Sequence, residues 1–413
     1  MNINIKKIVQ FIFSIKNASA SNHKIITIFG IKIKIKNFNF YRIKKNRIVF
    51  INFYGKGYGC NPKYITQCLL KENKSYEIIW LTTNTNMSIN NIPSEAKVVK
   101  YNVHNGIKYL SGAAIWINNT RNNIFYTHGL KKKKNQLYIQ TWHGSLGFKK
   151  IEKDIENNKL YENYLKIAQK DSQYIDYLLS PSKFDTKCLK NCFYYDGKIL
   201  EIGYPRNDIF FYNNEKKAEI INKIKNYYNI DSNKKLAIYV PTFRDSYRID
   251  LYNIESQALC QTLKEKFNSE WELIVRLHPK MLKQSHELSS LLNNTINATS
   301  YPDLQELLLA SDLLITDYSS AIWDFCLQDK PAFVYATDID DYTKERDFYV
   351  KLEELPFLIA ENQDELFKNI KNCNISEYIL SIRNYMNLRG HFDDGNASDK
   401  VVEIINKYIN NSK

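Results

Sequence analysis

Short runs of apolar residues recur along the chain, and stretches with helical periodicity separate many of them. The first clear run, residues 47–53, leads into a glycine-rich turn at 55–59 and then into a helical pattern at 62–71. A strand, a tight turn and a helix in this order open a βαβ unit. The run is apolar at most positions instead of alternating, which is typical of a strand buried on both faces. The pattern therefore predicts a parallel sheet covered by helices on both sides.

Further apolar runs fall into two groups. The first group holds the runs 78–81, 114–118, 138–141, 177–180 and 199–202. The second group holds the runs 236–240, 273–277, 312–316, 331–335 and 357–360. Helical patterns accompany the second group and end the chain at 254–267, 303–310, 320–327, 364–375, 377–388 and 398–409. We therefore predict the α/β class, with an N-terminal domain at 46–205 and a C-terminal domain at 206–413 that includes the terminal helices.

Residues 1–45 have a different pattern, and we predict a separate basic segment there. Ile31, Ile33 and Ile35 alternate with lysines, which indicates a half-exposed strand. Earlier apolar residues follow helical spacing and share one face: Ile5, Ile8, Val9, Ile12 and Phe13. An amphipathic helix at a membrane interface and an ordinary surface helix both fit this spacing. A signal peptide fits less well, because the apolar run is short and interrupted by polar residues.

The charge of the chain is concentrated near its beginning. The first acidic residue is Glu72, and fourteen lysines and arginines precede it. This number equals the net charge of +14, so the remaining residues are balanced between acidic and basic groups. A polybasic segment of this kind attracts anionic lipid headgroups, and a phosphate polymer or nucleic acid would be attracted by the same charge.

Composition and missing motifs exclude several classes of protein. An apolar fraction of 44% excludes a largely disordered chain, and no apolar run is long enough to predict a membrane-spanning helix. The seven cysteines form no CxxC pair, which favours free thiols in a reducing compartment over zinc ligands or disulfides. The sequence contains neither a Walker A motif for triphosphate hydrolysis nor an HExxH zinc motif.

Polar and basic residues follow five of the predicted strands. The segments are Trp142-His143-Gly144-Ser145, Gly203-Tyr204-Pro205-Arg206-Asn207-Asp208, Pro241-Thr242-Phe243-Arg244-Asp245, Arg276-Leu277-His278-Pro279-Lys280 and Asp317-Tyr318-Ser319-Ser320. Because open α/β sheets bind ligands at the carboxyl ends of their strands, we expect these segments to meet at one site.

The residue types at these strand ends suit a phosphate-rich substrate. Arg206, Arg244 and Arg276 offer planar groups that contact phosphate oxygens in pairs, although Arg244 and Asp245 are also positioned to pair with one another. Ser319 and Ser320 stand at the start of a predicted helix, where free N–H groups favour an anion. A helix N-cap is the simpler role for these serines, and ligand binding would be an additional one.

Two histidines are candidates for proton transfer. His143 and His278 have an intrinsic pKa range that suits acid–base chemistry near neutral pH. The structural alternatives are a hydrogen-bonded core position for His143 and a strand-ending position for His278. The positions of both histidines directly after strands favour a functional role. The other histidines have no supporting context, and we interpret them as structural or exposed: His23, His104, His128, His286 and His391.

Two nucleotide-binding patterns match weakly. The glycine turn at 55–59 lacks the spacing of a dinucleotide fingerprint, and a tight turn that lets a substrate approach is the better interpretation. Asp338-Ile339-Asp340 has the spacing of an acidic pair that binds a nucleotide-linked metal, but three-residue matches arise easily by chance.

In this order, the motifs resemble those of the CDP-glycerol glycerophosphotransferase family, the teichoic-acid polymerases and primases. The matching pieces are Gln140-Thr141-Trp142-His143-Gly144, Gly203 to Asp208, Pro241 to Asp245, Arg276-Leu277-His278-Pro279, Thr316-Asp317-Tyr318-Ser319-Ser320 with Asp324, Lys330-Pro331 with Tyr335, and Asp394-Gly395-Asn396-Ala397-Ser398. The resemblance runs from about residue 47 to the end of the chain. It departs at Ser145-Leu146-Gly147, where the family often has Thr-Pro-Leu, and this departure leaves the acceptor open.

The resemblance implies a GT-B fold, in which two Rossmann-like domains face each other across a cleft. By analogy, His143 and His278 are catalytic, and Asp317 and Arg244 support the site. The residues implied in donor binding are Gly144, Ser145, Leu146, Gly147, Arg206, Pro241, Thr242, Arg276, Leu277, Ser319, Ser320 and Asp324. The implied donor is CDP-glycerol or CDP-ribitol, and the implied acceptor is a lipid-linked molecule or a polysaccharide.

The expected chemistry is attack of an acceptor hydroxyl on the β-phosphorus of the donor, with release of CMP and His143 as the base. Protein cations suffice for such positioning and charge stabilisation, so we expect no cofactor and no metal. We expect no nucleic acid as partner, because the residues after 71 carry no net charge. The family works at the cytoplasmic face of the cell membrane, in agreement with an anionic membrane surface as partner of the basic N-terminal segment.

Two other functions remain open at this point. A sugar transferase that uses a nucleotide sugar would have the same fold, and fold alone does not decide between them. A non-enzymatic protein that binds membranes or nucleic acid through its basic segment is the more remote alternative, because its support is confined to the first 71 residues.

Overall fold

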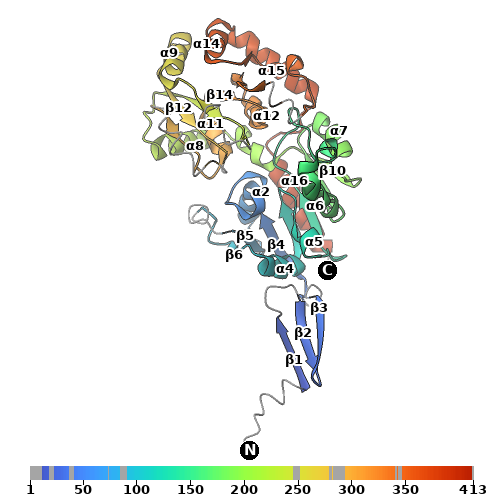
Figure 1. Ribbon diagram of the computed structural model, residues 1–413. Helices are drawn as coiled ribbons and strands as arrows, with labels where there is room; N and C mark the ends of the chain where they lie inside the picture. Colours follow the sequence, from blue (N-terminus) through green and yellow to red (C-terminus); the bar gives the residue numbers. More distant parts are fainter. Residues whose placement is uncertain are drawn as a thin grey trace, which may run out of the picture.

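The chain folds into three sheets, of which two are large. The computed structural model describes residues 12–17, 23–36, 41–72, 74–83, 91–244, 252–278, 281, 294–339, 342 and 347–411. A small three-stranded sheet stands at one end of the molecule, a seven-stranded sheet lies in the middle, and a six-stranded sheet lies at the other end (Figure 1).

The seven-stranded sheet has the order β10-β9-β8-β7-β4-β5-β6, and all neighbouring strands are parallel. Its strands are β4 (Lys44–Ile51), β5 (Glu77–Thr82), β6 (Lys97–Lys100), β7 (Ala113–Asn118), β8 (Leu137–Gln140), β9 (Tyr177–Ser180) and β10 (Lys198–Glu201). Every residue of the central strand β7 is buried, which explains why its sequence is continuously apolar until Asn118.

The helices of this half include α2 (Cys60–Lys71), α4 (Val103–Ser111), α5 (Ile124–Thr127), α6 (Glu162–Ser172) and α7 (Lys183–Cys192). Short 3₁₀ turns lie at η2 (Phe53–Gly55), η3 (Glu152–Ile155), η4 (Lys159–Tyr161) and η5 (Pro205–Phe211). The side chains of Asn102 and Ser182 accept hydrogen bonds from the backbone at the starts of α4 and α7, so local sequence fixes where these helices begin.

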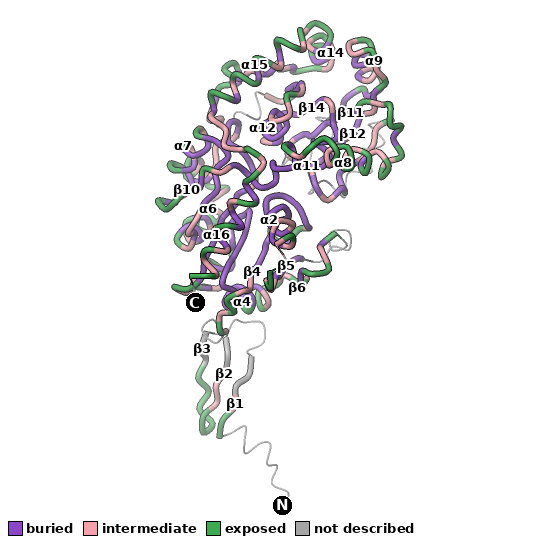
Figure 2. Tube along the Cα trace, turned by 180° about the vertical axis from the view of Figure 1, so that it is seen from behind, coloured by how far each residue is buried: buried purple, intermediate pink, exposed green. Residues whose placement is uncertain are grey.

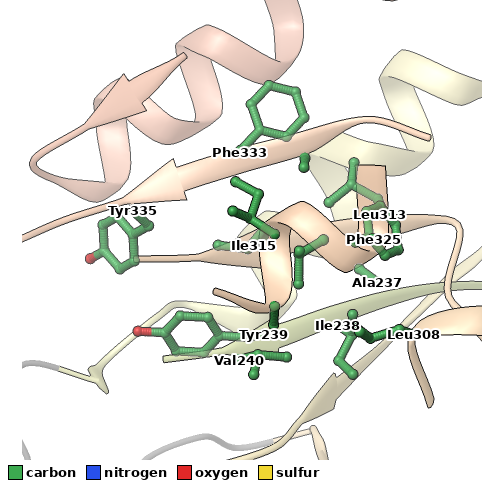
Figure 3. Close-up of a cluster of buried hydrophobic side chains, with 14 of the residues drawn as sticks. Ala237, Ile238, Tyr239, Val240, Leu308, Leu313, Ile315, Phe325, Phe333 and Tyr335 are labelled. Atoms are coloured by element: carbon green, nitrogen blue, oxygen red, sulfur yellow. The ribbon is translucent and has the colours of Figure 1, made fainter. Parts of the chain in front are cut away.

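The six-stranded sheet has the order β13-β12-β11-β14-β15-β16 and is also parallel. Its strands are β11 (Lys235–Val240), β12 (Trp271–Val275), β13 (Ile296–Asn297), β14 (Leu313–Thr316), β15 (Ala332–Tyr335) and β16 (Ile359–Ala360). Its apolar core joins the central strands to helices, as Ile238, Ile315 and Phe333 show beside Phe325 (Figure 3).

The helices after residue 213 cover the second sheet and then return to the first. They are α8 (Asn214–Tyr227), α9 (Ser256–Phe267), α11 (Leu304–Ala310), α12 (Ala321–Phe325), α14 (Gln363–Asn372), α15 (Ile375–Arg389) and α16 (Ala397–Asn411), with 3₁₀ turns η8 (Cys326–Gln328) and η9 (Leu352–Glu354). Val401, Val402 and Ile405 of α16 pack in the core of the first sheet beside Ile65 and Leu69 of α2. The domain division at 205/206 stays a prediction, and α16 belongs to the first sheet by packing.

A pair of motifs anchors this return of the chain. Asp208 accepts hydrogen bonds from the backbone of Ala397 and Ser398, at 3.0 and 2.8 Å, and so caps the start of α16. Asp393 accepts from Tyr204 N and from Asn207 Nδ2, at 2.9 and 3.1 Å. The segments 203–208 and 394–398, which are separate motifs in the sequence, therefore lie together and are connected by hydrogen bonds.

The fold-class prediction is confirmed, because both large sheets are parallel and Rossmann-like and the predicted strands lie within two or three residues of the observed ones. The strands β2 (His23–Ile28), β6 and β13 were not predicted. The alternating residues around Ile31 form β3 (Ile31–Lys36), as predicted. The predicted N-terminal helix is wrong at Phe13, which begins β1 (Phe13–Asn17), and Ile5, Ile8 and Val9 lie outside the described residues.

Two further expectations concern helices and cysteines. Within the described part of the chain, no helix is both long and apolar enough to cross a bilayer. All seven cysteines are free thiols; Cys60, Cys192 and Cys326 are buried, and the other four are partly buried.

Candidate active site

His143 lies in the loop that follows β8, with its ring held from one side. Its Nδ1 atom is 2.6 Å from the backbone oxygen of Asn119. A carbonyl oxygen only accepts hydrogen bonds, so Nδ1 carries the proton and Nε2 of the neutral ring keeps a free lone pair. The described residues provide no hydrogen-bond partner for Nε2. This is the tautomer that a proton acceptor needs.

The surroundings of His143 keep its ring uncharged. Burial lowers the pKa of His143 to about 4, the charge of Arg206 adds to this effect, and the hydrogen bond to Asn119 opposes it. The aromatic rings of Trp142 and Phe53 lie 4.3 and 5.4 Å from the imidazole, between ring centres. At neutral pH the imidazole is therefore neutral and ready to accept a proton.

Asn119 connects the His143 loop to the glycine-rich turn. Its side chain donates to Asn52 Oδ1 at 2.7 Å and accepts from the backbone N–H of Phe53 at 2.8 Å. Phe53, Tyr54 and Trp142 all have positive φ angles, of 41°, 59° and 53°, a conformation that costs free energy for such side chains. Sequence reasoning missed Asn119, because its contact to His143 is made by a backbone atom that no motif reveals.

Arg206 lies beneath this loop and has protein partners. Its guanidinium forms a buried ion pair with Asp324, 2.8 Å between Nη2 and Oδ2, and also donates to the backbone oxygen of His143. Burial alone would lower the pKa of Arg206, but the charge of Asp324 outweighs it, so the net shift is upward. Asp324 in turn accepts from Gln305 at 2.8 Å. Direct phosphate binding by Arg206 stays a prediction. The contacts of Arg206 with Asp324 and with the His143 backbone indicate that it positions the His143 loop.

The same loop packs tightly against α12 of the second half. A Cβ atom on Gly144 would meet the hydroxyl of Ser320 at 2.8 Å, and one on Gly147 would meet the ring of Trp323 at 2.7 Å. Glycine at these positions therefore permits the close approach of the loop to the helix. Ser319 and Ser320 are partly buried, and the hydroxyl that accepts from the helix is that of Ser319, 3.3 Å from Ala321 N.

Ser145 and Leu146 are buried within the loop. Leu146 N donates to Asp185 Oδ1 at 2.5 Å, and its backbone oxygen accepts from Arg389. Arg389 also pairs with Asp185 at 3.1 Å, so a residue of α15 fixes a loop of the first sheet. The main chain of residues 144–147 is thus held from both halves of the molecule.

A second group of predicted residues gathers after β11 and β14. Asp317 accepts from the backbone and the hydroxyl of Thr242, at 2.9 and 2.5 Å, and pairs with Arg244 at 2.9 Å. Arg244 also contacts Asp338 through two nitrogens, at 2.6 and 2.8 Å. Asp317 and Arg244 therefore support the loop that begins at the buried Pro241, and Asp338 belongs to an ion pair. Asp245 and Asp340 lie outside the described residues.

A third group follows β12. Arg276 donates to the backbone oxygens of Ala298, at 3.2 Å, and Tyr301, and burial lowers its pKa. Leu277 is buried and its N–H donates to Thr299 Oγ1 at 3.1 Å. His278 is exposed, with its ring centre 5.5 Å from that of Phe243. Pro279 and Lys280 lie outside the described residues.

A series of contacts connects these groups. Gly144 lies close to Ser320, which is three residues after Asp317 in the chain. Asp317 accepts a hydrogen bond from Thr242, and the next residue, Phe243, lies beside the ring of His278. All the segments leave the carboxyl ends of β8, β11, β12 and β14, as predicted.

A second group of buried charges also connects the two halves. Lys63 of α2 contacts Asp303 and Glu306 at the start of α11, at 2.5 and 2.7 Å, and Tyr301 donates to Glu306. This network was not predicted, since its members lie about 240 positions apart in sequence. It joins the first sheet to the segment that holds Arg276.

The sequence is similar to those of known proteins over most of its length. The family model described as CDP-Glycerol:Poly(glycerophosphate) glycerophosphotransferase matches residues 33–407. The chain belongs to this family. Because the match covers most of the chain, the resemblance inferred from the motifs is confirmed.

Individual relatives are similar over most of this chain. It is 33% identical to a teichoic acid poly(glycerol phosphate) polymerase of Staphylococcus epidermidis, covering 89% of this chain and 51% of the polymerase. It is 33% identical to a teichoic acid glycerol-phosphate transferase of Staphylococcus aureus, covering 93% and 97%. The solved wall teichoic acid polymerase TagF, as a variant soaked with CDPG, has a TM-score of 0.76, 31% identity and 90% coverage of both chains. The chain thus spans about half the length of one curated relative and nearly all of another.

Proposed function

We propose that the protein transfers glycerol phosphate from CDP-glycerol to a hydroxyl group of an acceptor and releases CMP. One observation carries the proposal: a neutral His143, protonated on Nδ1, stands in a loop that touches Ser320 across the two halves. The family and the polymerase soaked with CDPG support CDP-glycerol as the donor.

The proposed reaction is a displacement at the β-phosphorus of the donor. The acceptor oxygen forms the new P–O bond while His143 Nε2 takes the hydroxyl proton. The bond between the β-phosphorus and the bridging oxygen breaks, and CMP leaves with the electron pair. A phosphodiester is the other product, and the ring returns its proton to solvent after release.

Charge stabilisation falls to groups at the other strand ends. We assign Arg276 and His278 to the donor phosphates, together with the backbone and hydroxyl groups at Ser319 and Ser320. Arg206 acts as a positioning residue, because its guanidinium is engaged by Asp324 and the His143 carbonyl. Preorganised donors of this kind are worth about 2.7–4 kcal/mol each in comparable sites.

His143 is tested by substitution with alanine. The purified variant should bind CDP-glycerol, as measured by calorimetry, yet release almost no CMP in the presence of acceptor. The matched control is His104→Ala, because His104 is exposed on α4 and is not among the proposed site residues. CMP release near the parent rate by the His143 variant would remove this residue from the mechanism.

We further propose that the acceptor is a lipid-linked molecule or a polysaccharide, and that the protein acts peripherally at the cytoplasmic face of the membrane. The teichoic acid relatives and the basic N-terminal segment support this location. Extraction of membranes with high salt should release the protein, whereas a detergent requirement would contradict a purely peripheral attachment.

A further inference from the structure

The three-stranded sheet near the N-terminus has two chemically different faces. It consists of β1, β2 (His23–Ile28) and β3, in antiparallel order β1-β2-β3, and we call it the N-terminal sheet. In an antiparallel pair, opposite residues lie on the same face, and successive residues alternate between faces. The register therefore assigns each position to one of two faces.

One face is apolar across all three strands. Phe13 is opposite Ile28, and Ile28 is opposite Ile31. Two positions further along, Ile26 is opposite Ile33, so these five residues share a face. The register assigns positions 15 and 35, both isoleucines, to the same face, and at the far end of the sheet also positions 17 and 24, an asparagine and a lysine.

The other face is polar and basic. Ser14 is opposite Thr27, and Thr27 is opposite Lys32. Positions 16, 34 and 36, all lysines, fall on this face by the same register, with Ile25 among them. The N-terminal sheet is thus amphipathic, with a lysine face opposite an isoleucine face.

The apolar face is open within the described part of the chain. Phe13, Ile31 and Ile33 expose 52%, 67% and 47% of their surface, and Phe29 in the turn between β2 and β3 exposes 67%. None of the hydrophobic core clusters includes a residue of this sheet. The sheet projects from the end of the molecule opposite the six-stranded sheet (Figure 1), and the coloured part of β3 is exposed (Figure 2).

We propose that the N-terminal sheet docks on an anionic lipid bilayer, with its apolar face in the interfacial region and its lysines at the phosphate level. An interfacial element of this type places its apolar side chains about 5–10 Å into the headgroup boundary. Lysine side chains reach from the opposite face to the phosphates while their stems stay on apolar surface. The proposal extends the membrane location given under the proposed function and rests on it for that location only.

Charge complementarity favours a bilayer over a second copy of the chain. A dimer formed through the apolar faces would bury the isoleucines but would supply no anion to the lysines. The segment before Glu72 holds no acidic residue at all, so a second copy brings only further positive charge. An anionic bilayer satisfies both faces at once. The family model matches from residue 33 onward, so β1 and β2 precede the part that the model matches.

The test measures binding of the purified full chain to vesicles by co-sedimentation. Vesicles of phosphatidylcholine with phosphatidylglycerol should bind it, and vesicles of phosphatidylcholine alone should bind it weakly. The double variant Ile31→Ser/Ile33→Ser should bind at least about tenfold more weakly, because it removes apolar area from the interface. Lys32→Gln should weaken binding about fivefold, with a smaller difference at high salt.

Ile25→Ser is the matched control, because it makes the same substitution in the same sheet but on the opposite face. It should bind vesicles like the parent. CMP release with a water-soluble acceptor should be unchanged in all these variants, so a failed binding result is distinguishable from a failed enzymatic proposal. Parent-like vesicle binding by the double variant would overturn the proposal. So would a parent dimer, seen by sedimentation velocity, that becomes a monomer in the double variant without losing lipid binding.

Discussion

Removal of one partner from the Arg206–Asp324 pair should destabilise the protein strongly. The two side chains are 5% and 3% exposed and their charged atoms are 2.8 Å apart. In Asp324→Ala the guanidinium stays buried beside the His143 loop without its counter-charge. Loss of one member of a buried pair costs about 3–5 kcal/mol, and Gln305 also loses its acceptor at 2.8 Å.

The assay is urea unfolding followed by tryptophan fluorescence, with Trp323 adjacent to the substituted residue. We expect the unfolding midpoint of Asp324→Ala and of Arg206→Met to fall well below that of the parent. The double variant Arg206→Met/Asp324→Leu should recover much of the loss, because two apolar side chains replace the buried pair. The coupling between the two sites is read from the cycle of single and double variants.

The same experiment distinguishes a positioning role from phosphate binding. If Arg206 holds the loop, the double variant regains stability, and its KM for the donor changes less than its kcat, since His143 is displaced. A loss of less than about 1 kcal/mol in the single variants would contradict a stabilising buried ion pair. A rise in KM alone, with kcat and stability unchanged, would indicate that Arg206 binds the donor phosphates.

Three other predictions concern the same framework. Gly147→Ala should lower stability by about 1–3 kcal/mol, measured by urea unfolding, because its Cβ would lie 2.7 Å from Trp323, and an unchanged midpoint would contradict this packing. Burial raises the pKa of Glu306, but the charge of Lys63 and the hydrogen bonds to the carboxylate lower it to about 2 overall. The difference in free energy of unfolding between the parent and Glu306→Gln should therefore be largest above pH 4.5 and shrink as the pH falls toward 2. Because only neutral His143 accepts a proton and its pKa is about 4, the acid limb of kcat/KM should lie near pH 4, and a limb near 6.5 would contradict the burial argument.

The sequence predicted the sheets because parallel strands have a simple signature. Strands such as β7 and β11 are buried on both faces, so their apolar runs stand out against the surrounding helices. Strand β6 was missed because two lysines enclose only two valines, which is too short for either periodicity. The N-terminal helix was wrong at Phe13 because its apolar residues fit a helical spacing and a strand equally well over so short a run.

The candidate site was predicted in its parts but not in its connections. The position after each strand indicated His143, Ser320 and the arginines, since strand ends of parallel sheets share an edge. What the arginines contact was not predictable, because Asp324 lies 118 positions from Arg206. A pairing of this kind depends on tertiary packing, and local pattern has no information about it.

Identification of the donor and the product tests the proposed activity. The purified protein is incubated with CDP-glycerol, CDP-ribitol and a panel of nucleotide sugars, each with an acceptor, and free nucleotide and product mass are measured. We expect release of CMP from CDP-glycerol and a product heavier than the acceptor by one or more glycerol phosphate units. Release of a nucleoside diphosphate from a nucleotide sugar, with CDP-glycerol left intact, would contradict it.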